Sequence, residues 1–87
     1  MTYYMRKLDV ADAREFDVLL RAEPEGGFTV RVPAFPEIVS YGENEAEALA
    51  MAQEAIELVI EDRVERGEPI PAPDVIRLRS VAVAVPA

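Results

Sequence analysis

Few side chains in this 87-residue chain could serve as an activated nucleophile. Cysteine and histidine are absent, so neither of the two serines, Ser40 and Ser80, has an imidazole to accept its proton. Lys7 is the single lysine, and no spacing in the sequence brings it to either serine. The usual zinc sites are excluded as well, because they are built around cysteine and histidine. The residue types therefore argue against nucleophilic and zinc-dependent catalysis.

Carboxylates are better candidates for chemistry, because paired Asp and Glu side chains can transfer protons or hold Mg²⁺. Here they fall mainly at solvent-facing helix positions, and no spacing singles out a pair. Gly26 and Gly27 could cradle a phosphate, but neither a helix N-terminus nor a nearby lysine follows them, and a hairpin turn explains them fully. We therefore predict that the protein is not an enzyme and has no metal or cofactor. An enzyme with a carboxylate-bound Mg²⁺ or Mn²⁺ is the alternative.

The acidic balance of the chain bears on its partners. Seventeen acidic residues against nine basic ones give a formal net charge of −8 and a pI near 4.4. Such a charge repels phosphate backbones, which argues against direct nucleic-acid binding and favours a basic partner. The alternative is that acidity only keeps the protein soluble. Neither an 18-residue apolar run nor a signal peptide is present, so we expect a cytoplasmic protein without membrane contact.

The stretch Asn44–Gly67 is predicted to be one long helix that positions most of this charge. Asn44 is a suitable N-cap, and Glu47 can reach back to the backbone N–H of the cap. Gly67 and the prolines after it end the helix. An apolar stripe marks one face: Ala48, Leu49, Ala52, Ala55, Ile56, Val59, Ile60 and Val64. Acidic residues mark the other: Glu45, Glu47, Glu54, Glu57, Glu61, Asp62 and Glu65.

Alternating apolar and polar residues predict strands around this helix. The predicted elements, in order, are a short helix over 3–14, strands over 15–23, 28–32 and 38–41, the long helix over 44–67, and a last strand over 75–85. Pro33 and Pro36 interrupt the sheet with a bulge or loop. The fold class is therefore α+β, of order β-β-β-α-β, with one long helix packed on a small antiparallel sheet.

The predicted last strand changes phase at Ser80. Before it, Ile76 and Leu78 occupy one side of the alternation; after it, the valines at 81, 83 and 85 fall on the other side. Either a bulge near Ser80 restores the phase, or Val81, Val83 and Val85 face another chain and build a homo-oligomer, a dimer or tetramer. A frayed apolar tail is the third possibility.

A single helix covers only one face of such a sheet. The other face is predicted to show Leu19, Thr29, Arg31, Val39 or Tyr41, and Arg77. This mixture of apolar and charged groups suits a protein interface better than a ligand pocket. An ordinary solvated sheet face is the alternative.

Several short motifs, in this order and spacing, resemble the HicB-like antitoxin family over residues 17–74. They are Gly26-Gly27-Phe28-Thr29-Val30, Val32-Pro33-Ala34-Phe35-Pro36, Tyr41-Gly42, Glu45-Ala46-Glu47-Ala48-Leu49, Ala52, Glu54-Ala55-Ile56 and Arg66-Gly67-Glu68-Pro69-Ile70-Pro71-Ala72-Pro73. The resemblance implies a partial RNase H-like fold without the catalytic carboxylates of that enzyme, and a role in binding and inhibiting HicA toxins, small basic RNases that cleave mRNA.

Two departures from the family pattern matter. Glu37 stands where the family usually has glycine after the second proline, which implies a different loop geometry. Longer members carry a C-terminal DNA-binding segment, whereas this chain ends at Ala87, directly after the predicted last strand. We therefore expect a single HicB-like domain over residues 1–87, without a C-terminal DNA-binding domain.

These observations give two hypotheses. In the first, the protein is an antitoxin that occludes a basic RNase of the HicA type, and its partner-binding residues are Phe35, Pro36, Glu37 and Tyr41, because loop aromatics and prolines near the bulge are not needed to fill the helix-facing core. Phe35 as a plug of that core is the alternative. In the second, it is an orphan homo-oligomer, structural or regulatory, without a toxin partner.

Overall fold

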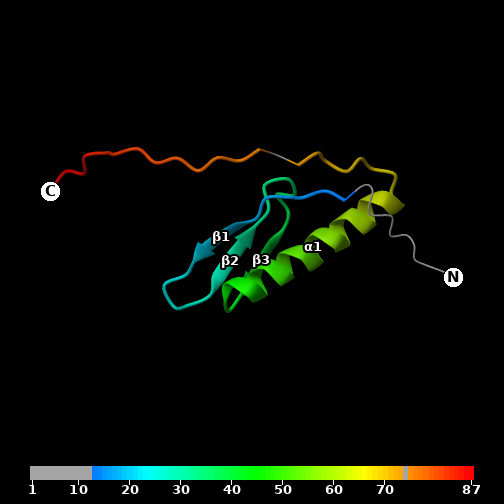
Figure 1. Cartoon of the computed structure of the whole chain (residues 1–87), viewed down its shortest axis with the longest axis horizontal. Helices are drawn as coiled ribbons and strands as arrows, with labels where there is room; N and C mark the ends of the chain where they lie inside the picture. Colours follow the sequence, from blue (N-terminus) through cyan, green and yellow to red (C-terminus); the bar gives the residue numbers. More distant parts are fainter. Residues whose placement is uncertain (1–12, 74) are drawn as a thin grey trace.

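The computed structural model describes residues 13–73 and 75–87. Its order is three strands and then one helix: β1 (Leu19–Ala22), β2 (Phe28–Arg31), β3 (Val39–Gly42) and α1 (Glu45–Glu65). The strands form one antiparallel sheet in the order β1-β2-β3, and α1 lies along one side of it (Figure 1). This confirms the predicted α+β arrangement of one long helix on a small antiparallel sheet. The predicted helix over 3–14 lies almost entirely outside the described residues.

The predicted strand over 75–85 is wrong for this structure. Residues 75–87, which we call the arm, are extended but belong to no strand of the described sheet. In Figure 1 residues 66–73 lead away from the end of α1, and the arm, coloured orange to red, runs alongside the domain and continues past the hairpin end of the sheet. Alternation shows that a segment can form a strand, but a strand also needs a neighbour to receive its backbone hydrogen bonds.

The β1–β2 hairpin turns where the sequence predicted it. Gly26 and Gly27 have φ angles of +107° and +82°, a region that glycine adopts without strain. The Glu23 amide donates to the Gly27 carbonyl at 3.0 Å, which closes the turn. The strands are paired so that Leu20 lies opposite Val30, and Val30 opposite Ser40, on the helix-facing side.

The core lies between α1 and the β2–β3 half of the sheet. Its fully buried members are Val30, Val32, Phe35, Ile38, Ala48 and Ala52. Gly42 lets α1 approach β3 closely, because a Cβ at this position would overlap the backbone of Ala48. Small residues on both elements therefore set the distance between helix and strand.

Both ends of α1 are capped. The Asn44 side chain accepts a hydrogen bond from the Glu47 amide at 2.8 Å, as predicted. The Glu47 carboxylate, however, accepts from the Glu43 amide at 2.6 Å and not from that of Asn44. At the other end Gly67 takes a φ of +69°, and the Glu68 amide donates to the Arg63 carbonyl at 2.8 Å.

Candidate functional site

The face of the sheet away from α1, which we call the open face, consists of two rows of side chains. The register places Leu19, Arg31 and Val39 in one row and Arg21, Thr29 and Tyr41 in the other. Val39 is 63% exposed and Tyr41 is 49% exposed. The sequence predicted this face correctly except for Arg77, which lies on the arm.

Hydrogen bonds fix the hairpin end of the open face. The Thr29 hydroxyl donates to the Glu23 carboxylate at 2.6 Å, and Arg21 Nε lies 3.4 Å from the same carboxylate oxygen. The Tyr41 hydroxyl donates to the Gly26 carbonyl at 3.1 Å, so its ring is held against the turn. A Cβ on Gly27 would overlap that ring. The exposed tyrosine is therefore presented in a defined orientation.

Phe35 is the predicted contact residue that the structure corrects. Its side chain is fully buried, so it cannot touch a partner directly. The Phe16 ring packs edge-on against it with 5.2 Å between centroids, and the Arg63 guanidinium lies 5.2 Å from its centroid. The core-plug alternative is the one that the structure supports. Phe35 fills the core because the loop after β2 folds inward, with the Ile38 amide donating to the Phe35 carbonyl at 2.9 Å.

Pro36 and Glu37 are exposed on the same loop. Glu37 Oε2 accepts a hydrogen bond from Arg63 Nη2 at 3.0 Å, which ties the loop to the last turn of α1. A hydrogen bond from its own backbone amide, and then this contact with Arg63, hold the pKa of the Glu37 carboxyl below its ordinary value. Tyr41 instead bonds to the hairpin. The predicted contact residues therefore divide between two ends of β3 and do not form one cluster.

The exposed surface of α1 is strongly acidic. Seven Asp and Glu residues fall within the helix, against the single base Arg63, which already pairs with Glu37. Arg66, just after the helix, pairs with Asp62 at 2.8 Å and lies 3.4 Å from Glu68. The positive charges near the end of α1 are thus largely matched, and the net field of this surface is negative.

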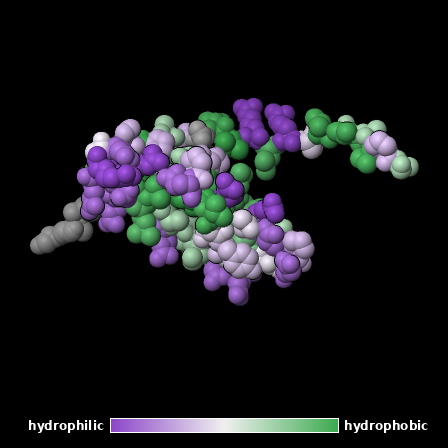
Figure 2. Space-filling model, turned by 180° about the vertical axis from the view of Figure 1, so that it is seen from behind, coloured by the Kyte–Doolittle hydropathy of each residue, from purple (hydrophilic) through white to green (hydrophobic). Residues whose placement is uncertain are grey.

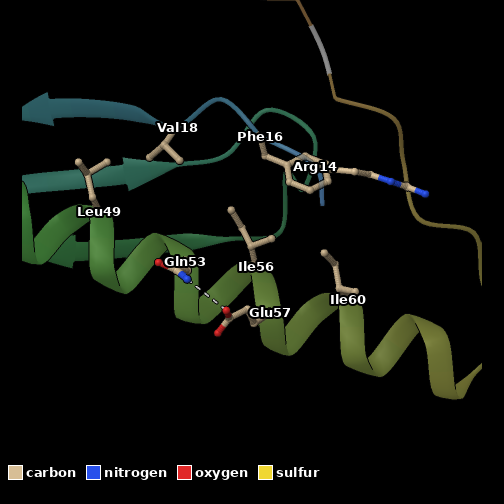
Figure 3. A pocket seen from close by; sticks show the side chains of 8 residues that line it. All are labelled: Arg14, Phe16, Val18, Leu49, Gln53, Ile56, Glu57 and Ile60. Atoms are coloured by element: carbon tan, nitrogen blue, oxygen red, sulfur yellow. Dashed lines mark hydrogen bonds between the residues drawn. The ribbon is translucent and has the colours of Figure 1, made fainter. Parts of the chain in front are cut away.

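A groove between α1 and the segment leading into β1 was not predicted. It has a volume of about 330 Å³ (Figure 3). Its walls are Arg14, Phe16 and Val18 on the β1 side and Leu49, Gln53, Ile56, Glu57 and Ile60 on α1. Gln53 Nε2 donates to Glu57 Oε2 at 3.3 Å on the helix side. A second hollow of about 260 Å³, lined by Arg14, Phe16, Ile60, Val64 and Ile70, borders it.

Leu49 and Val64 show why sequence reasoning missed the groove. Both belong to the apolar stripe of the helix that was predicted to pack on the sheet, yet they are 46% and 63% exposed. The period of the stripe identifies the face of a helix but not whether a strand covers its whole width. The signal that could have found the groove is the width of the stripe, which exceeds what three short strands cover.

The predicted oligomer residues are all on the arm. Val81, Val83 and Val85 are 84%, 74% and 85% exposed. Figure 2 shows the arm standing clear of the domain, with hydrophilic residues followed by hydrophobic ones. These valines therefore pack on nothing within the described chain.

The described residues, 13–73 and 75–87, contain no group of three or more acidic, histidine or cysteine side chains placed to hold a metal ion. They also contain no helix that combines the length and the apolar character needed to span a bilayer.

Comparison with protein-family models identifies a family for this chain. The family model described as the HicB-like antitoxin of bacterial toxin–antitoxin systems matches residues 15–87. A search of curated proteins finds no match. The matched range begins at the segment that leads into β1 and includes the whole arm.

Proposed function

The chain belongs to the HicB-like antitoxin family of bacterial toxin–antitoxin systems, and we propose that it inhibits a small basic RNase toxin of the HicA type by covering the RNA-binding surface of that toxin. This role is non-enzymatic. The observation that carries it is an exposed apolar patch on the open face, Val39 and Tyr41, in a chain whose helix surface is acidic. The acidic charge speeds encounter with a basic partner, and the apolar contacts slow dissociation.

The open face supplies the centre of the proposed contact. Tyr41 is an exposed aromatic residue whose orientation is fixed by Gly26, and fixed aromatic side chains lose little entropy on binding. Pro36 and Glu37 form the rim at the other end of β3. Buried Phe35 takes a positioning role, because it anchors the loop that presents these two residues.

Titration calorimetry at two salt concentrations tests the proposal directly. The ligand is the product of a small basic open reading frame beside the gene, in a catalytically disabled form, and an RNase assay with the active toxin runs in parallel. We expect tight binding that weakens with salt, together with loss of RNA cleavage. Absence of binding would contradict the proposal.

A matched pair of variants locates the contact. Val39→Asp on the open face should weaken toxin binding by at least about tenfold, because burying an unpaired carboxylate is costly. Val64→Asp is the control, since both valines are 63% exposed and Val64 lies on α1. Loss only in the control would place the contact on the helix and not on the open face. Equal loss in both variants would show that binding does not depend on the open face in particular, which also contradicts the proposed location.

The second candidate is an orphan homo-oligomer without a toxin, structural or regulatory in role. The exposed valines of the arm favour it. Self-association in a protein that binds no neighbouring basic protein would support this alternative.

A further inference from the structure

We propose that the arm of one copy lies in the groove beside β1 of a second copy, with Val81, Val83 and Val85 in contact with the apolar walls of that groove. This exchange does not depend on the toxin, because it joins two copies of the same chain. Four observations support it: the free backbone of the arm, the free edge of β1, the reach of the chain, and the distribution of charge.

The arm has the composition of a strand but no partner. Residues 75–87 make no backbone hydrogen bond with the rest of the described chain. Their valines and leucine are at least 74% exposed, apart from the partly shielded Ile76. The family match includes the arm, so this segment belongs to the domain and is not an appendage. An exposed, β-branched segment of this length is suited to pairing with a sheet edge.

β1 offers such an edge. Glu23 donates to Gly27, and hydrogen-bonded pairs alternate along an antiparallel ladder. Leu19 and Arg21 therefore bond to β2, whereas the backbone groups of Leu20 and Ala22 point away from it. β1 is an edge strand of the sheet order β1-β2-β3, so this side is unpaired within the described chain. The groove is lined by Val18, the residue directly before β1, so it borders the end at which this edge strand begins (Figure 3).

The reach of the chain favours a second copy over the arm's own groove. The groove extends along α1 from Ile60 to Leu49, which is about 16 Å at 1.5 Å per residue. The chain returns past this helix at Ile70, which lines the neighbouring hollow. An extended chain covers about 16 Å in five residues, so Val81, eleven residues beyond Ile70, would lie well past the end of its own groove. Figure 1 shows the arm passing the hairpin end in this way.

Charge complementarity also favours the exchange. The arm contains Arg77 and Arg79 and no acidic residue. Removing these two arginines from the total leaves 7 bases against 17 acids, so the rest of the chain carries −10. A +2 arm is therefore attracted to the acidic domain of another copy, which offsets part of the repulsion between two acidic molecules.

The first test is the association state of the full chain, by sedimentation equilibrium. We expect the native protein to be a dimer or larger, and Val83→Glu to weaken association by more than about tenfold, because the new carboxylate would be buried without a partner. Leu58→Glu is the control, since Leu58 is 61% exposed and turned by about 180° around α1 from Leu49. A monomeric native protein would overturn the proposal.

The second test identifies the two surfaces. The chain has no cysteine, so introduced cysteines are unambiguous. Mixing Val83→Cys with Leu49→Cys, each a single variant, should give a disulfide-linked heterodimer on oxidation, whereas Val83→Cys with Leu58→Cys should give far less. Equal yields in the two mixtures would overturn the proposal. So would a double variant, Val83→Cys with Leu49→Cys, that closes its disulfide only within one chain, because the arm would then occupy its own groove.

Discussion

The two sides of the sheet are packed differently under α1. On the β3 side the helix packs closely, with Ala48 against Gly42, and Phe35 from the loop before β3 belongs to the same buried cluster as Ala48. On the β1 side the same helix borders a groove, and its Leu49 remains half exposed. The same amphipathic helix therefore has a closely packed side next to β3, which we call the filled side, and a side next to β1 that borders the groove, which we call the hollow side. Apolar residues of the helix line this groove, and the described sheet has no fourth strand beside β1 to cover them.

This difference separates what holds the domain together from what is left to bind. On the filled side, small residues and the ring of Phe35 pack against one another, so contacts within the chain stabilise this side. The hollow side keeps apolar surface in water, which is unfavourable unless something covers it. The following variants test this division, from the largest expected effect to the smallest.

Phe35→Ala should remove the main support of the filled side. The side chain is fully buried, so we expect a loss of about 3–5 kcal/mol in the free energy of unfolding. Urea denaturation followed by circular dichroism measures it. Pro36→Ala, one residue on and exposed, should change stability by less than about 1 kcal/mol. Similar losses in both variants would mean that the loop, and not the ring, carries the stability.

Gly42→Ala tests the close approach of α1 to β3. The added methyl group would overlap the backbone of Ala48, and a helix backbone cannot yield as a side chain can. We expect a loss of about 1–3 kcal/mol in thermal or urea unfolding. Gly67→Ala is the comparison, because its surroundings are open and its only cost is the positive φ, about 1 kcal/mol. A neutral Gly42→Ala would show that the helix can shift on the sheet.

Leu49→Ala addresses the hollow side. In dilute solution it should cost less than about 1 kcal/mol, because the side chain is already half exposed. If a second copy covers the groove, the loss should grow as protein concentration rises, since association stabilises the folded chain by mass action. Ala50→Gly, at an exposed position of the same helix, provides the control. A loss that does not change with concentration would show that the groove stays empty.

The sequence predicted the local elements better than their assembly. Turn glycines, the Asn44 cap and the alternation of the three sheet strands are read from neighbouring residues, and each appears in the structure near its predicted place, although β1 begins at Leu19 and not at residue 15. The strand over 75–85 could not be settled this way, because pairing depends on a partner that local periodicity does not specify. The exposure of Leu49 could not be predicted for the same reason, because its position in the apolar stripe does not show whether a strand covers it.

The sequence predicted only part of the candidate site, because local alternation sets the face of a strand but not the direction of a loop side chain. The alternation of apolar and polar residues predicted Val39 and Tyr41 on the open face, because every second residue of a strand lies on the same face of the sheet. Phe35 was predicted to contact a partner, with a core plug as the alternative, because the sequence between the two prolines does not show in which direction the chain turns. Whether a loop side chain points inward is decided by the space beneath it, here the gap between Phe16 and Arg63.

The smallest expected effect concerns Glu37, which joins the loop of the filled side to the end of α1. Its own backbone amide and Arg63 hold its pKa below the ordinary 4.5. A lowered pKa in the folded state means that the ionised carboxylate stabilises the fold above pH 4.5. That contribution is lost as the pH falls below 4.5 and through the folded-state pKa. The Glu37 side chain is half exposed, so water screens the pair and the contribution is small.

Glu37→Gln should therefore be slightly less stable than the native chain near neutral pH, and the difference should shrink as the pH falls below 4.5. Urea midpoints across this range measure it. Glu25→Gln, in the hairpin turn and away from Arg63, controls for the loss of one acidic residue. Curves for Glu37→Gln and the native chain that coincide at every pH would mean that the contact with Arg63 does not hold the loop. Phe35 alone would then fix the loop on the filled side, and Pro36 and Glu37 would be free to rearrange when a partner binds.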